Sequence, residues 1–330
     1  MEVFITHNSA LQYWRTRRKE RGVQERRQRG RMPPATPPVA SVLLNSEVFG
    51  LSLPLDVTVG NANSRRTSRL FRTRLFSETM PERCLVNIGD GLLVASPELC
   101  FFQMASKLSF VKLIELGYEL CGTYSFILPE DVSADEEIEA SRETAYNLVQ
   151  LTNKKKLTAF VAQMPGKHGK KKATRALKYI IDGSGSPMET ILAILLVLPI
   201  NLGGYGFPLP EMNRRINPKA AMRKGASKQY YKCDLCWKDF NVAVEYDSYL
   251  YHSDSTGIAG DSIKRGDLAL SGIDVITVTN RQINSVGEFG KVAKQIASKL
   301  GRQIQIRNPR FTDVQSELRN QLLTINPRQK

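Results

Sequence analysis

The alternation of side chains in residues 231–247 constrains the fold more than any other feature of this sequence. The segment YKCDLCWKDFNVAVEYD contains two stretches of alternating polar and apolar residues, separated by a short turn at residues 238–241. Such a pattern predicts an antiparallel hairpin, because successive side chains of a strand point to opposite faces of a sheet. A slip of one residue would move every apolar side chain to the wrong face, so the pattern fixes the register. Asp234 then faces Glu245, and Lys232 faces Asp247.

This register predicts one apolar face and one charged face. The apolar face carries Cys233, Leu235, Trp237, Val242, Val244 and Tyr246. The charged face carries Lys232, Asp234, Ala243, Glu245 and Asp247. Carboxylates that face each other are unfavourable unless a cation or a proton intervenes, and their oxygens suit hard cations such as Mg²⁺ or Mn²⁺. The alternative interpretation is a solvent-exposed acidic face balanced by Lys232.

The cysteine spacing argues against a zinc site. Cys233 and Cys236 are an odd number of positions apart, so a regular strand would place their side chains on opposite faces. The sequence has 5 cysteines and no second Cys-x-x-Cys pair, and His252 is the only additional candidate ligand nearby. A structural zinc ion needs four ligands. We therefore expect no zinc.

The charge balance indicates the kind of partner. The 330 residues include 47 Lys and Arg against 32 Asp and Glu, a net charge of +15. This excess favours a polyanionic partner such as nucleic acid, although a soluble protein with a basic surface would share it. The odd, sparse cysteines and the lack of an apolar signal segment predict a cytoplasmic location. The most apolar run, at 188–200, is too short to span a bilayer, so we expect a buried helix and no membrane association.

The composition along the chain predicts an α/β (α+β) protein with four segments. Residues 1–38 are expected to form an N-terminal helix, capped by Asn8 or Ser9, and a basic, Pro-rich flexible linker. That linker is either a phosphate-binding arm or a solvated tether, and we prefer the tether. The next segments are a small mixed α/β domain at 39–152, a basic linker with a helix at 153–184, and a final domain at 185–330. Its core is expected to be a mixed sheet flanked by helices.

Two basic stretches are candidates for contact with nucleic acid. The helix expected at 170–178 would align several cations along one face. An alternating basic strand at 69–76 would present others. The predicted phosphate contacts are Lys170, Lys171, Arg175, Lys178, Arg69 and Arg72.

The ordered series GSPMET (185–190), KCDLCW, VEYD and DSIKRGDLALSGIDVITVTNRQI (261–283) resembles the PD-(D/E)XK nuclease-like fold. It is most similar to the small domains of very-short-patch-repair endonucleases, over about residues 185–305. In that fold an acid on a helix precedes an Asp on a strand and a Glu-x-Lys on the next strand. The resemblance implies that Glu189, Asp234 and Glu245 hold Mg²⁺ or Mn²⁺ and that the domain cleaves DNA.

The sequence departs from this family at one position. Asp247 stands where the Glu-x-Lys pattern has its lysine, which in this fold orients water and stabilises charge. Lys232 is the first candidate to replace it, and Arg265 or Lys264 the second. His252 is either a general acid or an ordinary surface histidine. The missing lysine leaves open a catalytically inactive nuclease fold that binds DNA or regulates transcription.

The region upstream adds a second resemblance. Residues 54–130 are similar to the segment that precedes such domains in abortive-infection, type IV antitoxin-like proteins, which implies a defence role and a possible partner protein. The winged helix with which those proteins usually begin is not recognisable here. A scaffold that binds only protein is a further alternative.

Overall fold

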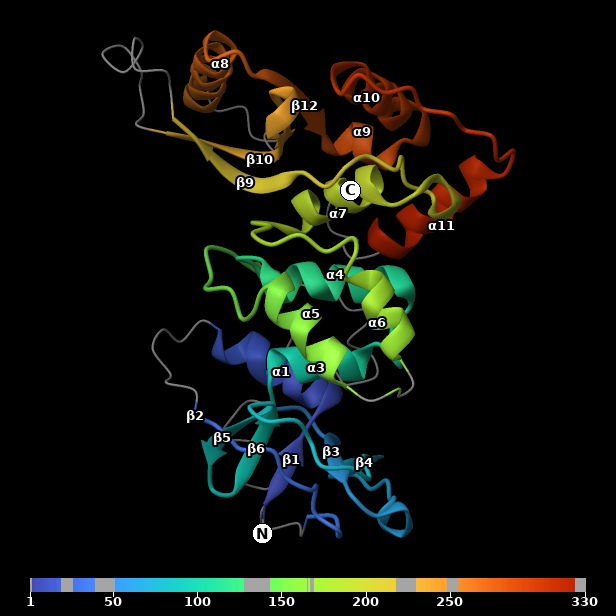
Figure 1. The fold of residues 1–330 in the computed structure, drawn as a ribbon. Helices are drawn as coiled ribbons and strands as arrows, with labels where there is room; N and C mark the ends of the chain where they lie inside the picture. Colours follow the sequence, from blue (N-terminus) through green and yellow to red (C-terminus); the bar gives the residue numbers. More distant parts are fainter. Residues whose placement is uncertain are drawn as a thin grey trace. The chain divides into compact units, whose positions relative to one another are not determined.

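The computed structural model describes residues 2–18, 26–38, 51–127, 143–164, 166, 169–217, 230–247 and 255–323 (Figure 1). The fold is α/β, as the sequence predicts. The described residues up to Ile180 form one compact unit, and those from Ile181 onward form a second. In the described part of the chain, no helix has the length and apolar character needed to cross a membrane.

A six-stranded sheet forms the base of the first unit. Its strands, in spatial order, are β2 (Arg26–Arg27), β5 (Leu85–Gly89), β6 (Leu92–Ala95), β1 (Val3–Ile5), β3 (Leu55–Val59) and β4 (Phe71–Leu75). β1 pairs in parallel with β6 and antiparallel with β3, and all three of its residues are buried. β4 lies at the edge and pairs in parallel with β3. A separate pair joins β7 (Ser125–Ile127) to β8 (Glu143–Ala145).

Helices cover this sheet in layers. α1 (His7–Arg17) and α3 (Pro97–Met104) lie against it, and α4 (Phe110–Cys121), α5 (Lys154–Gln163) and α6 (Lys170–Ala176) follow beyond them (Figure 1). α3 begins as its sequence indicates: Pro97 occupies the first turn and the Ser96 hydroxyl accepts the N–H of Leu99. A short 3₁₀ helix, η2 (Ala62–Ser64), precedes β4.

The described part of the N-terminal segment belongs to the first unit. β1 is a central strand of the sheet, and the Arg15 guanidinium forms a buried ion pair with Glu119 at 2.7 Å. Arg18 donates to the carbonyls of Glu119 and Tyr124 at 2.9 and 2.7 Å. The expectation of a solvated tether is therefore wrong for Arg15 and Arg18, because a carboxylate and buried carbonyls accept the hydrogen bonds of their guanidinium groups. Residues 19–25 lie outside the described part.

The start of α1 also differs from the prediction. Thr6, not Asn8 or Ser9, is the N-cap, and its side chain makes no capping bond. Asp56 supplies the missing acceptor from β3, since its Oδ2 accepts the N–H of Asn8 at 3.3 Å. A carboxylate at this position also complements the positive end of the helix dipole.

The second unit is built on a four-stranded mixed sheet. Its spatial order is β12 (Asp274–Thr279), β11 (Val242–Asp247), β10 (Tyr231–Trp237) and β9 (Glu211–Ile216). β9, β10 and β11 are antiparallel neighbours, and β12 is parallel to β11. The parallel pair is connected through α8 (Ser255–Leu270), as a parallel connection requires. The other elements are α7 (Pro187–Val197), η4 (Ile200–Leu202), η6 (Lys238–Phe240), α9 (Asn280–Asn284), α10 (Val286–Lys299) and α11 (Phe311–Leu323).

α7 is the buried helix that the apolar run predicts. The Ser186 hydroxyl accepts the N–H of Glu189, and every residue from Glu189 to Val197 is buried. The helix stops before Pro199, which disfavours helical backbone in the residue before it. Aromatic rings in the segment after α7 then contact rings of the core, with 5.7 to 6.5 Å between centroids. Its members are Tyr205, Phe207, Trp237, Phe289 and Phe311.

The predicted hairpin register is confirmed for the three pairs next to the turn. Leu235 faces Val244, Cys236 faces Ala243 and Trp237 faces Val242. Beyond these three pairs, β10 continues beside β9, and β11 continues beside β12. The sheet therefore forks at the position of Asp234 and Glu245.

Both cysteines of the hairpin lie in one core cluster, with Tyr231, Ala243 and Leu268. The expectation that Cys233 and Cys236 point to opposite faces is wrong, because strand alternation breaks between them. Asn213, which flanks this point on β9, has a left-handed φ of 49°, and the ladder pairs on either side omit Asp234. Such an irregularity shifts the facing of the residues that follow it.

Candidate functional site

The fork in the second sheet brings together acids from three elements. Glu189 comes from the first turn of α7, Asp234 from β10 and Glu245 from β11. Burial and then the charge of Asp234 raise the pKa of both other carboxyls, so Asp234 interacts with each of them. The three residues that the sequence singled out thus share one site. The alternative interpretation, a solvent-exposed acidic face, does not fit these three residues, since none of them is exposed.

The Glu189 carboxylate is held by neutral donors. Its Oε2 accepts the backbone N–H of Gly185 at 2.7 Å and the side-chain amide of Asn213 at 2.5 Å. The same amide donates to the carbonyl of Gly183 at 3.0 Å. A Cβ at position 185 would lie 3.0 Å from Glu189 Oε1, so glycine allows the backbone to approach the carboxylate closely.

Asp234 occupies the opening of the fork. Its Oδ2 accepts the backbone N–H of Tyr246 at 2.8 Å, in place of a carbonyl from the strand opposite. Burial raises the pKa of Asp234. The hydrogen bond from Tyr246 and the nearby charges of Lys264 and Lys232 oppose this rise. The net pKa lies above the ordinary value. Burial of the charged form therefore outweighs the three favourable interactions.

Glu245 is paired with a lysine from the next helix. Lys264 Nζ of α8 donates to Glu245 Oε2 at 2.8 Å. Glu245 Oε1 is buried and has no hydrogen bond of normal geometry within the described structure; the weak donor beside it is the Cys233 thiol. Burial lowers the pKa of Lys264, but the charges of Glu245 and Asp234 raise it overall. Lys264 is therefore the ammonium group built into the site.

The site holds its carboxyls at unusual proton affinities. Burial, and then the charge of Asp234, raise the pKa of Glu189 from 4.5 to about 7. The same two causes raise the pKa of Glu245 from 4.5 to about 7, despite its contact with Lys264. Carboxyls whose pKa values lie near neutrality in one cluster are typical of sites that bind cations or transfer protons.

The other residues predicted for this site are more dispersed. Lys232 is exposed and faces Arg215 of β9, although its charge still lowers the pKa of Asp234. Asp247 faces Thr279 of β12, so the predicted Lys232–Asp247 pair is not part of the ladder. Arg265 is exposed on α8 beside Lys264. His252 lies outside the described residues.

Asp234 and Glu245 offer the carboxylate oxygens that a divalent cation needs. Among the described residues, no three or more His, Cys, Asp or Glu side chains are arranged to hold a metal ion. Mg²⁺, however, is commonly held through one or two carboxylates, with water and substrate phosphate completing its shell. Asp234 and Glu245 fit that arrangement, because Glu245 Oε1 is an unsatisfied oxygen beside a second carboxylate.

Two of the predicted phosphate contacts around α6, Lys170 and Arg175, make contacts within the first unit. Lys170 Nζ donates to the carbonyls of Ala162 and Met164. The Arg175 guanidinium stacks 4.4 Å from the centroid of the Phe110 ring. α6 ends at Ala176, so Lys178 lies beyond it and the expected row of cations along one helix face is interrupted. Lys171 and Lys178 are exposed.

The arginines of the basic strand are divided. Arg72 lies on β4 and lines a pocket, whereas Arg69 lies in the exposed turn before that strand and does not line it.

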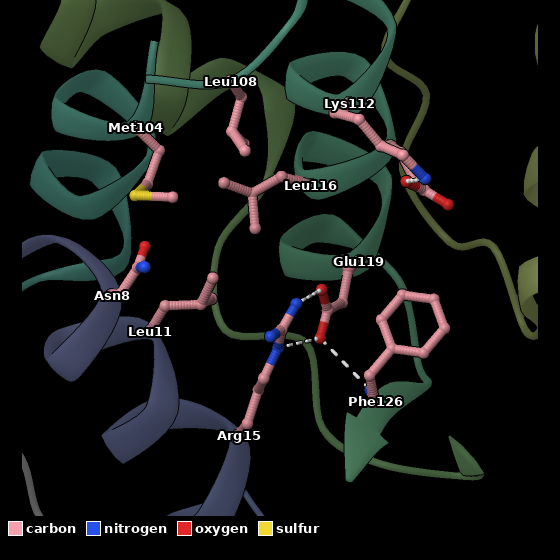
Figure 2. Close-up of a pocket in the computed structure, with 10 residues that line it drawn as sticks. Asn8, Leu11, Arg15, Met104, Leu108, Lys112, Leu116, Glu119 and Phe126 are labelled. Carbon is pink, nitrogen blue, oxygen red and sulfur yellow. Dashed lines mark hydrogen bonds and ion pairs between the residues drawn. The ribbon is translucent and has the colours of Figure 1, made fainter. Parts of the chain in front are cut away.

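A second hollow, of about 50 Å³, lies among α1, α3 and α4 of the first unit (Figure 2). The Arg15–Glu119 ion pair forms one wall, and Glu119 also accepts the N–H of Phe126 at 3.2 Å (Figure 2). Lys112 on the far side is paired with Glu115 at 2.9 Å. This volume holds one or two water molecules. We assign it a structural role.

Two contributors to the acid site were not among its first predicted residues. Asn213 carries no sequence signal, because the segment EMNRRI does not show which residue will adopt a left-handed φ. Lys264 was the second-choice substitute for the missing lysine, and its place on a helix that follows Glu245 is the signal that pointed to it.

Comparisons with known proteins give limited further information. No protein-family model matches the chain. No solved structure matches it significantly. Two proteins of Mycobacterium tuberculosis, from strains CDC 1551 / Oshkosh and ATCC 25618 / H37Rv, are each 24% identical to it over 142 residues. Both are described as uncharacterized, and the match covers 43% of this chain and 47% of theirs, so it spans about half of each relative's length.

Proposed function

We propose that the second unit is a metal-dependent nuclease-like domain that hydrolyses phosphodiester bonds of nucleic acid, with DNA as the substrate of choice. The observation that carries this proposal is the partly buried cluster of Glu189, Asp234 and Glu245 at the fork of the sheet, with Lys264 in contact with Glu245. The charge of Asp234 acts on both glutamates, which is unfavourable without a cation or a proton and is typical of a site for a ligand or a reaction.

The order of elements also supports it. The resemblance to PD-(D/E)XK proteins implies an acid on a helix, an Asp on a strand, a Glu on the next strand, then a helix and a final core strand. The second unit has α7, β10, β11, α8 and β12 in that order, with Glu189, Asp234 and Glu245 on the first three. This order of elements supports a nuclease-like fold by analogy, whereas the proposed chemistry rests on the residues of the site.

Each side chain has a role in this proposal. Asp234 and Glu245 would hold Mg²⁺ or Mn²⁺ through their carboxylate oxygens. The ion, when bound, supplies Lewis acidity toward phosphate and lowers the pKa of bound water. Lys264 places a positive charge beside Glu245 and would serve in place of the family's lysine, at whose sequence position this chain has Asp247. Glu189, with its pKa near 7, is suited to accept a proton at neutral pH.

One observation favours a second candidate. Lys264 Nζ is already engaged by Glu245 at 2.8 Å, which partly neutralises the cluster without any metal. A nuclease fold with this internal ion pair and no lysine at position 247 would bind nucleic acid without cleaving it. We rank this second, because repulsion from Asp234 and Glu245 would weaken the binding of a phosphate backbone.

Cleavage of supercoiled plasmid in Mg²⁺ or Mn²⁺ tests the proposal. We expect the wild type to nick or linearise the plasmid and Asp234→Asn to lose at least about a hundredfold in rate, as expected when a metal site is disrupted. Glu288→Gln is the matched control, since Glu288 is also an acid paired with a lysine, at 2.7 Å, but on the exposed surface of α10. A wild type that binds DNA and leaves it intact would favour the binding module.

A further inference from the structure

A basic pocket lies at the edge of the sheet in the first unit. β4 is the edge strand, and residues 65–68 fold back beside it, so that Thr67 pairs antiparallel with Arg72. The pocket between these segments has a volume of about 440 Å³. Its lining consists of Arg65, Arg66, Thr67, Arg72, Thr73 and Arg74.

Hydrogen bonds fix the shape of this hairpin. The Thr73 hydroxyl accepts the N–H of Arg66 at 2.6 Å and donates to the Arg66 carbonyl at 2.8 Å. The Thr73 N–H donates to the same carbonyl at 2.9 Å. In the turn, the Ser68 hydroxyl accepts the N–H groups of Leu70 and Phe71 at 3.2 Å each. The backbone beneath the arginines is therefore held before any ligand binds, which lowers the entropic cost of binding.

One of the arginines is anchored from below. Arg74 Nε donates to Asp56 Oδ1 at 2.8 Å, and Lys107 Nζ donates to Asp56 Oδ2 at 3.3 Å. Asp56 is buried, and the charges of Lys107 and Arg74 keep its pKa below the ordinary value. Asp56 thus stays ionised and orients the Arg74 guanidinium at the wall of the pocket.

The lining selects the class of ligand. Of the residues that the structure describes there, four are arginines, two are threonines, and neither a carboxylate nor an aromatic ring is present. Guanidinium groups bind phosphate oxygens with two parallel hydrogen bonds, whereas a nucleobase needs a ring on which to stack. A site of this composition is suited to contact phosphate and not to recognise the bases.

We propose that the Arg65–Arg74 pocket binds backbone phosphate of nucleic acid, independently of base sequence. The site belongs to the first unit and does not depend on the proposed hydrolysis. It also separates the two arginines that the sequence pattern grouped together, since Arg72 lines the pocket and Arg69 does not.

Binding of a labelled oligothymidylate to the full chain, in buffer with EDTA, tests this. The variant is Arg65→Gln/Arg66→Gln. The control is Lys155→Gln/Lys156→Gln, which removes the same number of charges at exposed positions of the first unit outside the pocket. Titrations between about 50 and 200 mM salt give the dependence of affinity on salt. Its slope falls by about 0.7 for each phosphate of a single strand that the protein no longer neutralises.

We expect the pocket variant to bind the oligonucleotide at least about tenfold more weakly, with a shallower salt slope, and the control to change about twofold or less. Sodium tripolyphosphate should compete with the oligonucleotide on the wild type and not on the pocket variant. Equal weakening in variant and control would overturn the proposal, because it would show a diffuse basic surface. Tripolyphosphate binding without oligonucleotide binding would overturn it too, in favour of a small-anion site.

Discussion

Replacement of Glu189 by glutamine should stabilise the second unit at neutral and alkaline pH. The Glu189 oxygen that accepts the Gly185 N–H and the Asn213 amide is a single atom, Oε2, so a glutamine carbonyl can accept both bonds. The substitution keeps the shape of the side chain and removes its charge from beside Asp234. Natural proteins often gain stability when an acid of a functional site is neutralised.

The magnitude follows from the pKa of Glu189, which burial and Asp234 raise from 4.5 to about 7. Each tenfold change in proton affinity is worth about 1.4 kcal/mol, so the ionised carboxylate costs at most about 3 kcal/mol above pH 7. A buried amide keeps part of the desolvation cost. We therefore expect Glu189→Gln to raise the free energy of unfolding by about 1 to 3 kcal/mol at about pH 8.

The sign of the pH dependence is fixed. Below about pH 4.5 the carboxyl is protonated in both the folded and unfolded states, so its favourable contribution is fully present. Between about 4.5 and 7 the unfolded state ionises first, and the wild type loses stability relative to the variant. Above about pH 7 the difference is constant. The advantage of Glu189→Gln should therefore be small at about pH 4 and reach its plateau near pH 7.

The assay is urea unfolding in a chelating buffer, followed by the fluorescence of Trp237. The chain has 2 tryptophans, and a Trp14→Phe background restricts the signal to the second unit. Glu288→Gln, at a surface-exposed acid of the same unit, is the control and should show no such gain. The refuting result would be a Glu189→Gln protein that is less stable than the wild type at about pH 8, with the same difference in unfolding free energy at about pH 4.

Three further predictions concern charged groups elsewhere. Lys264→Met should destabilise the second unit by about 1 to 3 kcal/mol near neutral pH, because it leaves Glu245 without its cation. Arg265→Met should change stability by about 0.5 kcal/mol or less, and urea unfolding of both variants tests this. Arg15→Met should cost the first unit about 3 to 5 kcal/mol, since it strands the buried Glu119 carboxylate; a loss below about 1 kcal/mol by thermal unfolding would contradict that account. Asn213→Asp should raise the pKa of Glu189 further, because a carboxylate would replace its amide donor; carboxyl NMR titration in which that pKa falls or stays fixed would count against the assigned hydrogen bond.

Much of the fold was accessible from the sequence where a periodic pattern and burial agree. The hairpin pairs next to the turn and the buried helix in the apolar run at 188–200 were both predicted and observed. The N-terminal segment was misjudged because a run of arginines has no periodicity that distinguishes solvated cations from cations that bind buried carbonyls. Arg18 is one of the latter, and its partners lie about a hundred residues away in the chain.

The site was predictable in its acids and less so in their setting. Alternation with a fixed register placed Asp234 opposite Glu245, and the structure adds that the strands separate there. At that point Asp234 accepts the Tyr246 N–H and Asn213 has a left-handed φ, and no local pattern specifies either feature. Register from a regular strand therefore located the residues and missed the irregularity that turns a hairpin face into a partly buried site.

Calorimetric titration of Mn²⁺ into the wild type and Asp234→Asn measures whether the acids at the fork form a cation site. We predict saturable binding to the wild type at millimolar metal or below and its loss in Asp234→Asn, with Glu288→Gln unchanged. Wild-type protein that shows no saturable heat, or an Asp234→Asn variant that binds as well as the wild type, would contradict it.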